Sequence, residues 1–273
     1  MVFIDSIILK SMDRLHKIYS DIKEVRIQGA TNIAKAAVKA YTLAPSAENK
    51  KKLLSLRPTE PTLSNALNFI DKIGAEEVIL HFSKSQAKIN KFVFKLIKNS
   101  SVVYTHCHST NVLKALIYAK KNGKKFEVYN TETRPLLQGR TTAKELAKNG
   151  IKVTTFVDAA LDDAITECDL ILLGADAILK NGVINKIGSE AIAEIAFIRK
   201  KYLYIVADSW KFSPYNVKIE ERDFHEVWKN ASSKIKIRNP AFESVNKKYI
   251  KGIISEYGVL KFDDFIKKMR KIL

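Results

Sequence analysis

The sequence predicts an α/β protein in which an N-terminal helical domain, residues 1–99, is followed by a Rossmann-like doubly wound parallel sheet, residues 100–273. Two observations lead to this fold class. Up to about residue 100, apolar residues recur three and four positions apart, which is the period of an amphipathic helix. Beyond that point, short apolar strands alternate with helical stretches, as parallel strands joined by crossover helices require.

The helical domain is defined by its breaks. One helical segment ends near Gly29, and an amphipathic segment follows at 33–41, for which Thr31 or Asn32 is a suitable N-terminal cap. A second break, around Pro58 and Pro61, precedes a helix that begins near Thr62, and a long helix is expected over 76–98.

The second domain is predicted to hold five strands, at 101–105, 125–129, 151–157, 169–173 and 202–207. Helices are predicted between strands at 111–121, 142–148 and 190–199. Ligands of such sheets bind beyond the carboxyl ends of the strands. The polar residues that follow each strand are therefore candidate site residues.

Composition narrows the function classes. Hydrophobic residues make up 46% and charged residues 28%, which is typical of globular proteins. The formal charge of +18 comes from lysines in scattered short runs without interleaved aromatic residues. We therefore interpret it as a solvated, lysine-rich surface that attracts anionic metabolites, rather than as a nucleic-acid-binding face.

Targeting signals and disulfides are not indicated. No signal peptide is recognisable, and no apolar run approaches the roughly 20 residues of a membrane span, so we expect a cytoplasmic protein without membrane contact. The two cysteines, Cys107 and Cys168, fall in different elements, and Cys168 is expected to pack in the core.

Polar residues follow each predicted strand. The first strand leads into Thr105-His106-Cys107-His108-Ser109-Thr110, the second into Asn130-Thr131-Glu132-Thr133-Arg134-Pro135 and Gln138-Gly139-Arg140, the third into Asp158, the fourth into Gly174-Ala175-Asp176, and the fifth into Asp208-Ser209-Trp210-Lys211. Between the last two, Asn185-Lys186-Ile187-Gly188-Ser189 opens a helix whose amide groups suit a phosphate.

A metal site is not expected. His106 and His108 flank Cys107, but alternation along a strand points the cysteine away from both histidines, and no second ligand group has suitable spacing. Simpler interpretations stay open for single residues: Cys107 as a buried small side chain, Asp176 as a turn cap, and Glu132 with Arg134 as an ion pair.

The joint order of these motifs is more specific than any one of them. Thr-His-Cys, then Glu-Thr-Arg-Pro with Gln-Gly, then Gly-Ala-Asp, then Asn-Lys-Ile-Gly resembles the family of ribose-1,5-bisphosphate isomerase and methylthioribose-1-phosphate isomerase. That family also includes the α, β and δ regulatory subunits of initiation factor two-B. Gln28-Gly29-Ala30 and Arg57-Pro58-Thr59 resemble its N-terminal pieces, so the resemblance covers nearly the whole chain.

The resemblance implies an aldose-ketose isomerase without a cofactor. In the isomerases, the residues matching Cys107 and Asp176 are the catalytic pair, here the base and the acid. A thiol beside a helix N-terminus and basic residues has a lowered pKa, and a carboxyl shielded from water has a raised one, which suits these roles. The positions that hold substrate phosphates and hydroxyls in the family correspond to Gln28, Gly29, Ala30, Thr31, Arg57, Ser109, Thr110, Asn111, Arg134, Gln138, Asn185, Lys186 and Lys211.

The branch of the family is indicated by a few residues. Cys107 resembles the isomerases, and Trp210-Lys211-Phe212 resembles the ribose-1,5-bisphosphate type. Gln28-Gly29-Ala30-Thr31 resembles the regulatory subunits, which bind a nucleotide or sugar phosphate without converting it and associate with an initiation factor. Methylthioribose-1-phosphate isomerase is a second alternative. The resemblance also implies a homodimer or hexamer.

Overall fold

The chain in the computed structural model divides into two compact units, residues 1–83 and 84–273. The structure describes residues 2–24, 26–27, 29–58, 60–219 and 221–273, with side chains from residue 12 onward. Within these residues, no helix combines the length and the hydropathy that a bilayer crossing needs.

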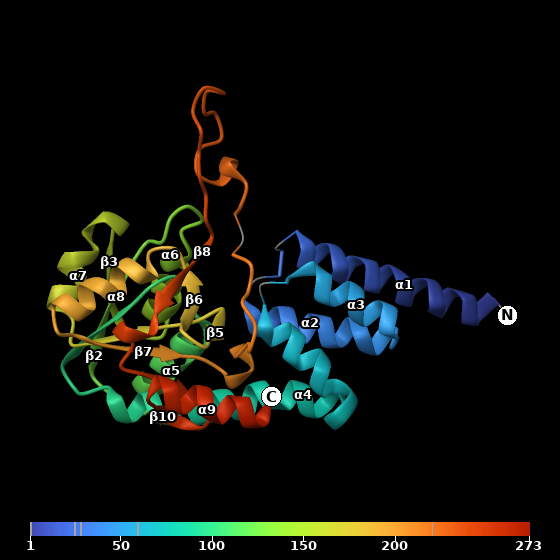
Figure 1. The fold of residues 1–273 in the computed structure, drawn as a ribbon, viewed down its shortest axis with the longest axis horizontal. Coiled ribbons are helices and arrows are strands. Elements are labelled where there is room, and N and C mark those ends of the chain that lie inside the picture. Colours follow the sequence, from blue (N-terminus) through green and yellow to red (C-terminus); the bar gives the residue numbers. More distant parts are fainter. Residues whose placement is uncertain (1, 25, 28, 59, 220) are drawn as a thin grey trace. The chain divides into compact units, whose positions relative to one another are not determined.

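The N-terminal unit is helical, as predicted (Figure 1). It contains α1 (Val2–Lys23), α2 (Ala30–Leu43), α3 (Ala47–Leu56) and the first part of α4 (Pro61–Leu96). Gly74 interrupts α4 with a φ of 81°, so the helices predicted to begin near Thr62 and at residue 76 are the two parts of α4.

Apolar residues of all four helices form the core of this unit, among them Leu15, Ile33, Leu53 and Leu67. The predicted cap of α2 is wrong. The helix begins one residue after Gly29, whose φ of 85° turns the chain without a side-chain cap, and Thr31 and Asn32 lie inside the helix.

The C-terminal unit is built on a mostly parallel sheet, which confirms the predicted α/β class. Seven strands of its described residues join in the order β10-β9-β7-β4-β1-β2-β3, parallel except for β10. The strands are β1 (Ser101–Thr105), β2 (Phe126–Thr131), β3 (Lys152–Phe156), β4 (Leu170–Leu173), β7 (Tyr202–Val206), β9 (Gly252–Ser255) and β10 (Gly258–Leu260).

Helices cover both faces of this sheet. They are α5 (Thr110–Lys121), α6 (Gln138–Lys148), α7 (Leu161–Glu167), α8 (Ser189–Ile198) and α9 (Phe262–Ile272). Successive strand residues point to opposite faces: Val103 packs with α5, α6 and the end of α4, whereas its neighbour Tyr104 packs with α7, α8 and α9. Cys168 belongs to the same core as Tyr104 and is fully buried, as expected.

Two features were not predicted from the sequence. A small antiparallel sheet consists of β5 (Ala177–Leu179), β6 (Gly182–Lys186) and β8 (Phe242–Asn246). Along the chain, β5 and β6 come between β4 and α8, whereas β8 follows β7, and β6 ends at the predicted site residues Asn185 and Lys186. The arm, described at residues 213–219 and 221–241, links β7 to β8, and its part beyond residue 220 projects from this unit (Figure 1). Its two limbs meet at a bridge between Glu221 and Pro240.

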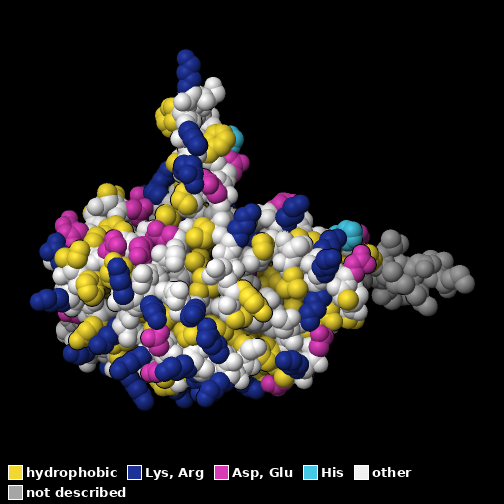
Figure 2. Space-filling model, in the orientation of Figure 1, with side chains coloured by type: hydrophobic (Ala, Val, Ile, Leu, Met, Phe, Trp, Pro, Cys, Tyr) yellow, Lys and Arg dark blue, Asp and Glu magenta, His cyan; other side chains and the backbone are white. Residues whose placement is uncertain are grey.

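Basic side chains are dispersed over the surface. Figure 2 shows Lys and Arg side chains across the visible face and on the arm, with acidic and apolar side chains between them. This distribution agrees with the interpretation of the +18 charge as a general property of the surface.

Candidate active site at the carboxyl ends of the strands

The backbone of Cys107 is held on both sides where β1 ends. Its φ of 62° is rare for a residue with a side chain and turns the chain out of the sheet into α5. The Cys107 amide donates to Thr133 Oγ1 at 3.0 Å, and its carbonyl accepts from Thr142 Oγ1 at 2.8 Å. Left-handed backbone of this kind persists only where surrounding contacts fix it, and it is concentrated at functional sites.

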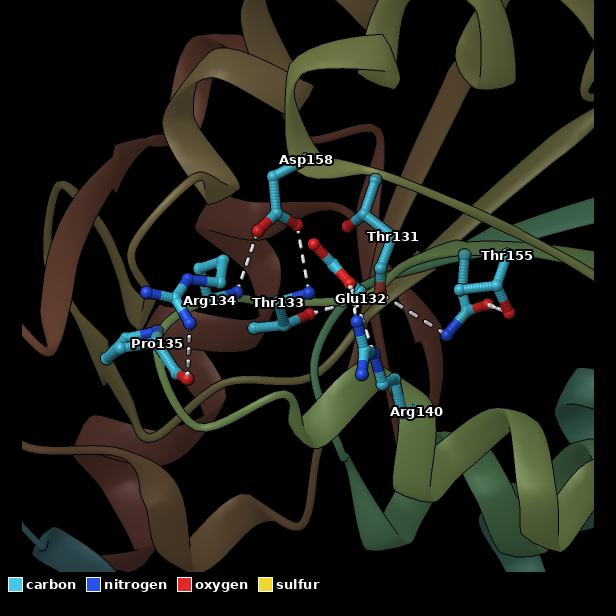
Figure 3. A network of polar contacts seen from close by, with 9 residues as sticks. Thr131, Glu132, Thr133, Arg134, Pro135, Arg140, Thr155 and Asp158 are labelled. Atoms are coloured by element: carbon cyan, nitrogen blue, oxygen red, sulfur yellow. Dashed lines mark hydrogen bonds and ion pairs between the residues drawn. The ribbon is translucent and has the colours of Figure 1, made fainter. Parts of the chain in front are cut away.

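Asp158 organises the loop that connects β2 to α6 (Figure 3). Its two carboxylate oxygens accept from the backbone amides of Thr133, at 2.9 Å, and Arg134, at 2.7 Å. Glu132 pairs with Arg140, not with Arg134 as the simpler interpretation had it, because the first turn of α6 brings Arg140 back beside it. The Arg134–Pro135 peptide is cis.

Gly139 allows α6 to begin against the end of β2. A Cβ at this position would lie 1.8 Å from the carbonyl oxygen of Thr131, a distance that no side chain can adopt. The Gly139 carbonyl accepts from Asn130 Nδ2 at 2.7 Å. The glycine of the Gln-Gly motif is therefore required for this close approach.

Two buried lysines bring positive charge to the same end of the sheet. Lys186 is the last residue of β6 and is 5% exposed, and Lys211 follows β7 and donates from Nζ to the carbonyl of Ala175, next to Asp176. Asp176 is partly exposed and follows β4. Asn185 Nδ2 donates to Ser189 Oγ at 2.9 Å, which ties β6 to the first residue of α8.

His106 Nε2 contacts the Ile187 carbonyl, which brings the neighbouring Cys107 and Lys186 to the same place, and the charges of Lys186 and Asp176 both act on the Cys107 thiol. Burial raises the pKa of Cys107 to about 12, while a hydrogen bond from the His108 amide and the Lys186 cation oppose that rise. The expectation of a lowered pKa is wrong for this state, because desolvation of the thiolate outweighs the one nearby cation.

The pKa of Lys186 is shifted by the same surroundings. Burial lowers its pKa, and the Arg222 cation lowers it further, whereas Cys107, Glu226 and Asp176 raise it. Shifted pKa values grouped at one end of a sheet are typical of a functional site.

The other predicted substrate-binding residues of this unit include those that follow β1 and β2. Ser109 caps α5 and accepts from the Val112 amide, and Thr110 is the first residue of the helix. Asn111 is buried and donates to Gln86 Oε1 at 2.8 Å. Arg134 is exposed and donates to the carbonyl of Val227 in the arm at 3.0 Å.

Gln138 opens α6 and offers a binding atom. Its Oε1 is buried and has no hydrogen-bond partner among the described residues. A buried acceptor without a partner costs about 1–3 kcal/mol, which a hydroxyl group of a bound ligand would recover.

The remaining predicted residues belong to the helical unit. Gln28 lies outside the described residues. Gly29, Ala30 and Thr31 form the start of α2, and the buried Arg57 pairs with Glu60 at 3.4 Å. Their part in the site stays a prediction.

Sequence reasoning missed two groups of residues near this site. Arg222 and Glu226 form a bidentate ion pair at the base of the arm, and Asn239 Nδ2 also donates to Glu226. A charged pair at i and i+4 was a visible signal, but nothing local indicated its proximity to Lys186. His106 was placed in the Thr-His-Cys motif and weighed as a metal ligand, but no structural role was predicted for it. Both of its ring nitrogens are bonded within the protein.

Comparison with known proteins identifies the family. The model of the initiation factor 2 subunit family matches residues 24–262. The chain belongs to that family. It is 36% identical to a ribose 1,5-bisphosphate isomerase of Methanocaldococcus jannaschii, over 92% of this chain and 93% of the relative.

Solved structures of other proteins share the fold. The chain superposes with a TM-score of 0.82 on a Pyrococcus horikoshii structure described as translation initiation factor eIF-2B, at 29% identity, covering 91% of this chain and 97% of the other. It superposes with a TM-score of 0.76 on the 5-methylthioribose 1-phosphate isomerase of the same organism, covering 95% and 88%. At 22% identity, this last likeness shows the fold alone.

Proposed function

We propose that this family member converts ribose 1,5-bisphosphate to ribulose 1,5-bisphosphate, with Cys107 as base and Asp176 as acid. The observation that carries the proposal is that His106 contacts the Ile187 carbonyl, so the neighbouring Cys107 and Lys186 meet at one end of the sheet, where the charges of Lys186 and Asp176 act on the thiol. The M. jannaschii relative, 36% identical over nearly its full length, carries the name of this activity.

The proposed reaction needs no redox reagent. Asp176 gives a proton to the ring oxygen as the bond from that oxygen to C1 breaks. Cys107, as thiolate, takes the proton from C2, and the electrons of that C–H bond form a double bond between C1 and C2. Return of the proton from Cys107 to C1 and loss of the C2 hydroxyl proton to Asp176 then give the ketone and restore both groups.

The raised pKa of Cys107 sets the energy of the base step. Forming the thiolate at pH 7 from a thiol of pKa about 12 costs about 7 kcal/mol, at 1.36 kcal/mol for each unit. Ten turnovers per second correspond to a barrier of about 16 kcal/mol, so less than half of the barrier is used in making the base. The Lys186 cation keeps this cost from being larger.

Phosphate binding is proposed for the buried lysines and the loop residues. Lys186 and Lys211 supply fixed positive charge, and Ser109, Thr110 and Gln138 supply polar groups at the first turns of α5 and α6. We extend this role to Arg57 and to Gly29, Ala30 and Thr31 on the basis of the sequence resemblance.

Phosphorus NMR with purified protein tests the proposal directly. Ribose 1,5-bisphosphate and methylthioribose 1-phosphate are supplied separately, and we expect turnover of the first. Cys107→Ser and Asp176→Asn should each lose several orders of magnitude in kcat/KM. Cys168→Ala is the matched control, since it removes a buried thiol remote from these residues and should keep most of the activity.

Each other outcome points elsewhere. Turnover of methylthioribose 1-phosphate alone would assign the second isomerase activity. No turnover of either sugar, together with retention of an initiation factor in a pull-down, would favour a regulatory subunit. Reaction in deuterium oxide examines the base: deuterium at C1 of the product supports Cys107, and complete retention of the C2 hydrogen would favour a hydride shift instead.

We further propose that the protein forms a homodimer or hexamer in the cytoplasm. The arm carries the apolar side chains of Tyr215, Phe224, Trp228 and Ile235, with 79% of Tyr215 and 52% of Trp228 exposed. Apolar groups presented in this way are typical of association surfaces. Light scattering should give a multiple of the 30.9 kDa chain mass, and Tyr215→Lys with Trp228→Lys should lower it; a monomeric wild-type protein would contradict the proposal.

A further inference from the structure

The imidazole of His106 is fixed between three elements of the sheet unit. The side chain follows β1 and is 4% exposed. Nδ1 lies 2.8 Å from Thr131 Oγ1 on β2, and Nε2 lies 2.9 Å from the carbonyl oxygen of Ile187, in the turn between β6 and α8.

These contacts determine the tautomer. The Ile187 carbonyl can only accept, so Nε2 carries the proton and donates, and Nδ1 accepts from the Thr131 hydroxyl. Thr131 Oγ1 in turn accepts from the Tyr104 hydroxyl at 3.3 Å. Burial lowers the pKa of His106, which keeps the ring in this neutral form. The directions of the hydrogen bonds that link Tyr104, Thr131, His106 and Ile187 are thereby defined, and the Thr133 hydroxyl lies 3.4 Å from the same Nδ1.

The turn held by His106 is the one that presents Lys186. Ile187 follows Lys186 directly, and Gly188 then adopts a φ of 98° to begin α8. A Cβ on Gly188 would lie 3.4 Å from His106 Nε2, so the turn packs tightly on the ring. The imidazole therefore sits between the backbone that carries Cys107 and the backbone that carries Lys186.

We propose that His106 is a positioning residue, whose Nε2–H bond to the Ile187 carbonyl holds Lys186 close to the Cys107 thiol. It touches no reacting atom and acts through Lys186. The proposal rests on the proposed isomerase function for its kinetic consequences, but the hydrogen bond itself does not depend on that function.

Two near-isosteric variants separate the two ring nitrogens. His106→Gln places an amide N–H near the position of Nε2 and can keep the bond to Ile187. His106→Asn keeps an acceptor toward Thr131 but does not reach Ile187. We expect His106→Gln to retain kcat within about threefold. His106→Asn should lose about 10- to 100-fold in kcat with little change in KM, because Lys186 is then misplaced relative to the Cys107 thiol.

Alkylation of Cys107 reports on Lys186 without any substrate. In His106→Asn the cation moves away, so the thiolate is less favoured, and Cys107 should react with iodoacetamide more slowly than in the wild type at each pH. A general loosening of the fold would accelerate the reaction instead. Equal kinetic behaviour of the two variants, or faster labelling in His106→Asn, would overturn the proposal.

Nitrogen-15 NMR of the wild-type imidazoles provides a measurement that needs neither variant nor turnover. We expect one neutral ring with the proton on Nε2, assigned to His106 by its loss in His106→Gln. A ring protonated on Nδ1, or charged at pH 7, would contradict the proposed bond. If the wild type isomerises neither sugar, the proposed function fails, while the NMR and alkylation results still decide the role of His106.

Discussion

The reactivity of the Cys107 thiol is the most direct measure of the site electrostatics. Burial raises its pKa from an ordinary value of 9.0 to about 12. At pH 7.5 this shift of about three units reduces the thiolate population about a thousandfold, which is about 4 kcal/mol. Because alkylation requires the thiolate, native Cys107 should react with iodoacetamide at least a hundredfold more slowly than the same residue in the unfolded chain.

The assay is timed labelling followed by peptide mass spectrometry, from pH 6.5 to 10. Cys168 is an internal reference in every sample, because its thiol is fully buried and burial also raises its pKa to about 12. Labelling in denaturant gives the rate for the unfolded chain. The native rate of Cys107 should rise about tenfold for each pH unit, without a plateau below pH 10.

Lys186→Met tests the source of the remaining stabilisation. The Lys186 cation lowers the pKa of Cys107, so its removal should slow labelling further, and Lys180→Met on the exposed β5–β6 turn is the matched control that should leave the rate unchanged. A plateau near pH 8 or 9, or equal native and unfolded rates, would refute the argument that burial dominates this thiol.

Three further perturbations address the supporting structure. Gly139→Ala places a Cβ 1.8 Å from the Thr131 carbonyl oxygen, so α6 must shift. We expect the free energy of unfolding, measured with denaturant, to fall by about 1–3 kcal/mol and the activity to fall strongly. A variant of unchanged stability would contradict the contact. Asp158→Ala removes an acceptor of two backbone amides and should cost about 2 kcal/mol, checked in the same way against Asp163→Ala, an exposed residue. The pKa of His106 is lowered by burial and by the Lys186 cation, against the opposing Asp158 charge, so the unfolded chain binds the proton more readily. The contribution of His106 to the free energy of unfolding is therefore complete above about pH 6.5 and is lost as the pH falls toward the lower pKa of the folded state. His106→Gln should flatten the dependence of this free energy on pH in that range. An unchanged slope would exclude His106 as its source.

The parts of the fold set by local pattern could be predicted from the sequence. The strand at 101–105 coincides with β1, and the strand predicted at 202–207 ends one residue beyond β7, because a buried parallel strand needs a short apolar run between breaks. The start of α6 was predicted less accurately than its end at Lys148: the helix begins at Gln138, four residues before the prediction, since its start depends on packing of Gly139 against β2.

The small sheet and the arm could not be predicted from local sequence pattern. β5 has three residues, and β6 pairs with β8 some 60 positions later, so no local period marks either strand. The arm contains polar and apolar residues without a regular period, and its base is fixed by the contact of Glu221 with Pro240 and by the Arg222–Glu226 ion pair.

By itself, the sequence determined the succession of helices and strands, the polar clusters at the strand ends, and the candidates Cys107, Asp176 and Lys186, because each depends on residues close together in the chain. Only the tertiary structure decided the pKa shifts of Cys107 and Lys186. The pKa of Cys107 depends on how completely water is excluded and on a cation 79 positions away, and the tautomer of His106 depends on Thr131 and Ile187 from other elements. Desolvation and charge act through space, and a local sequence pattern does not encode how close residues from different elements come to one another.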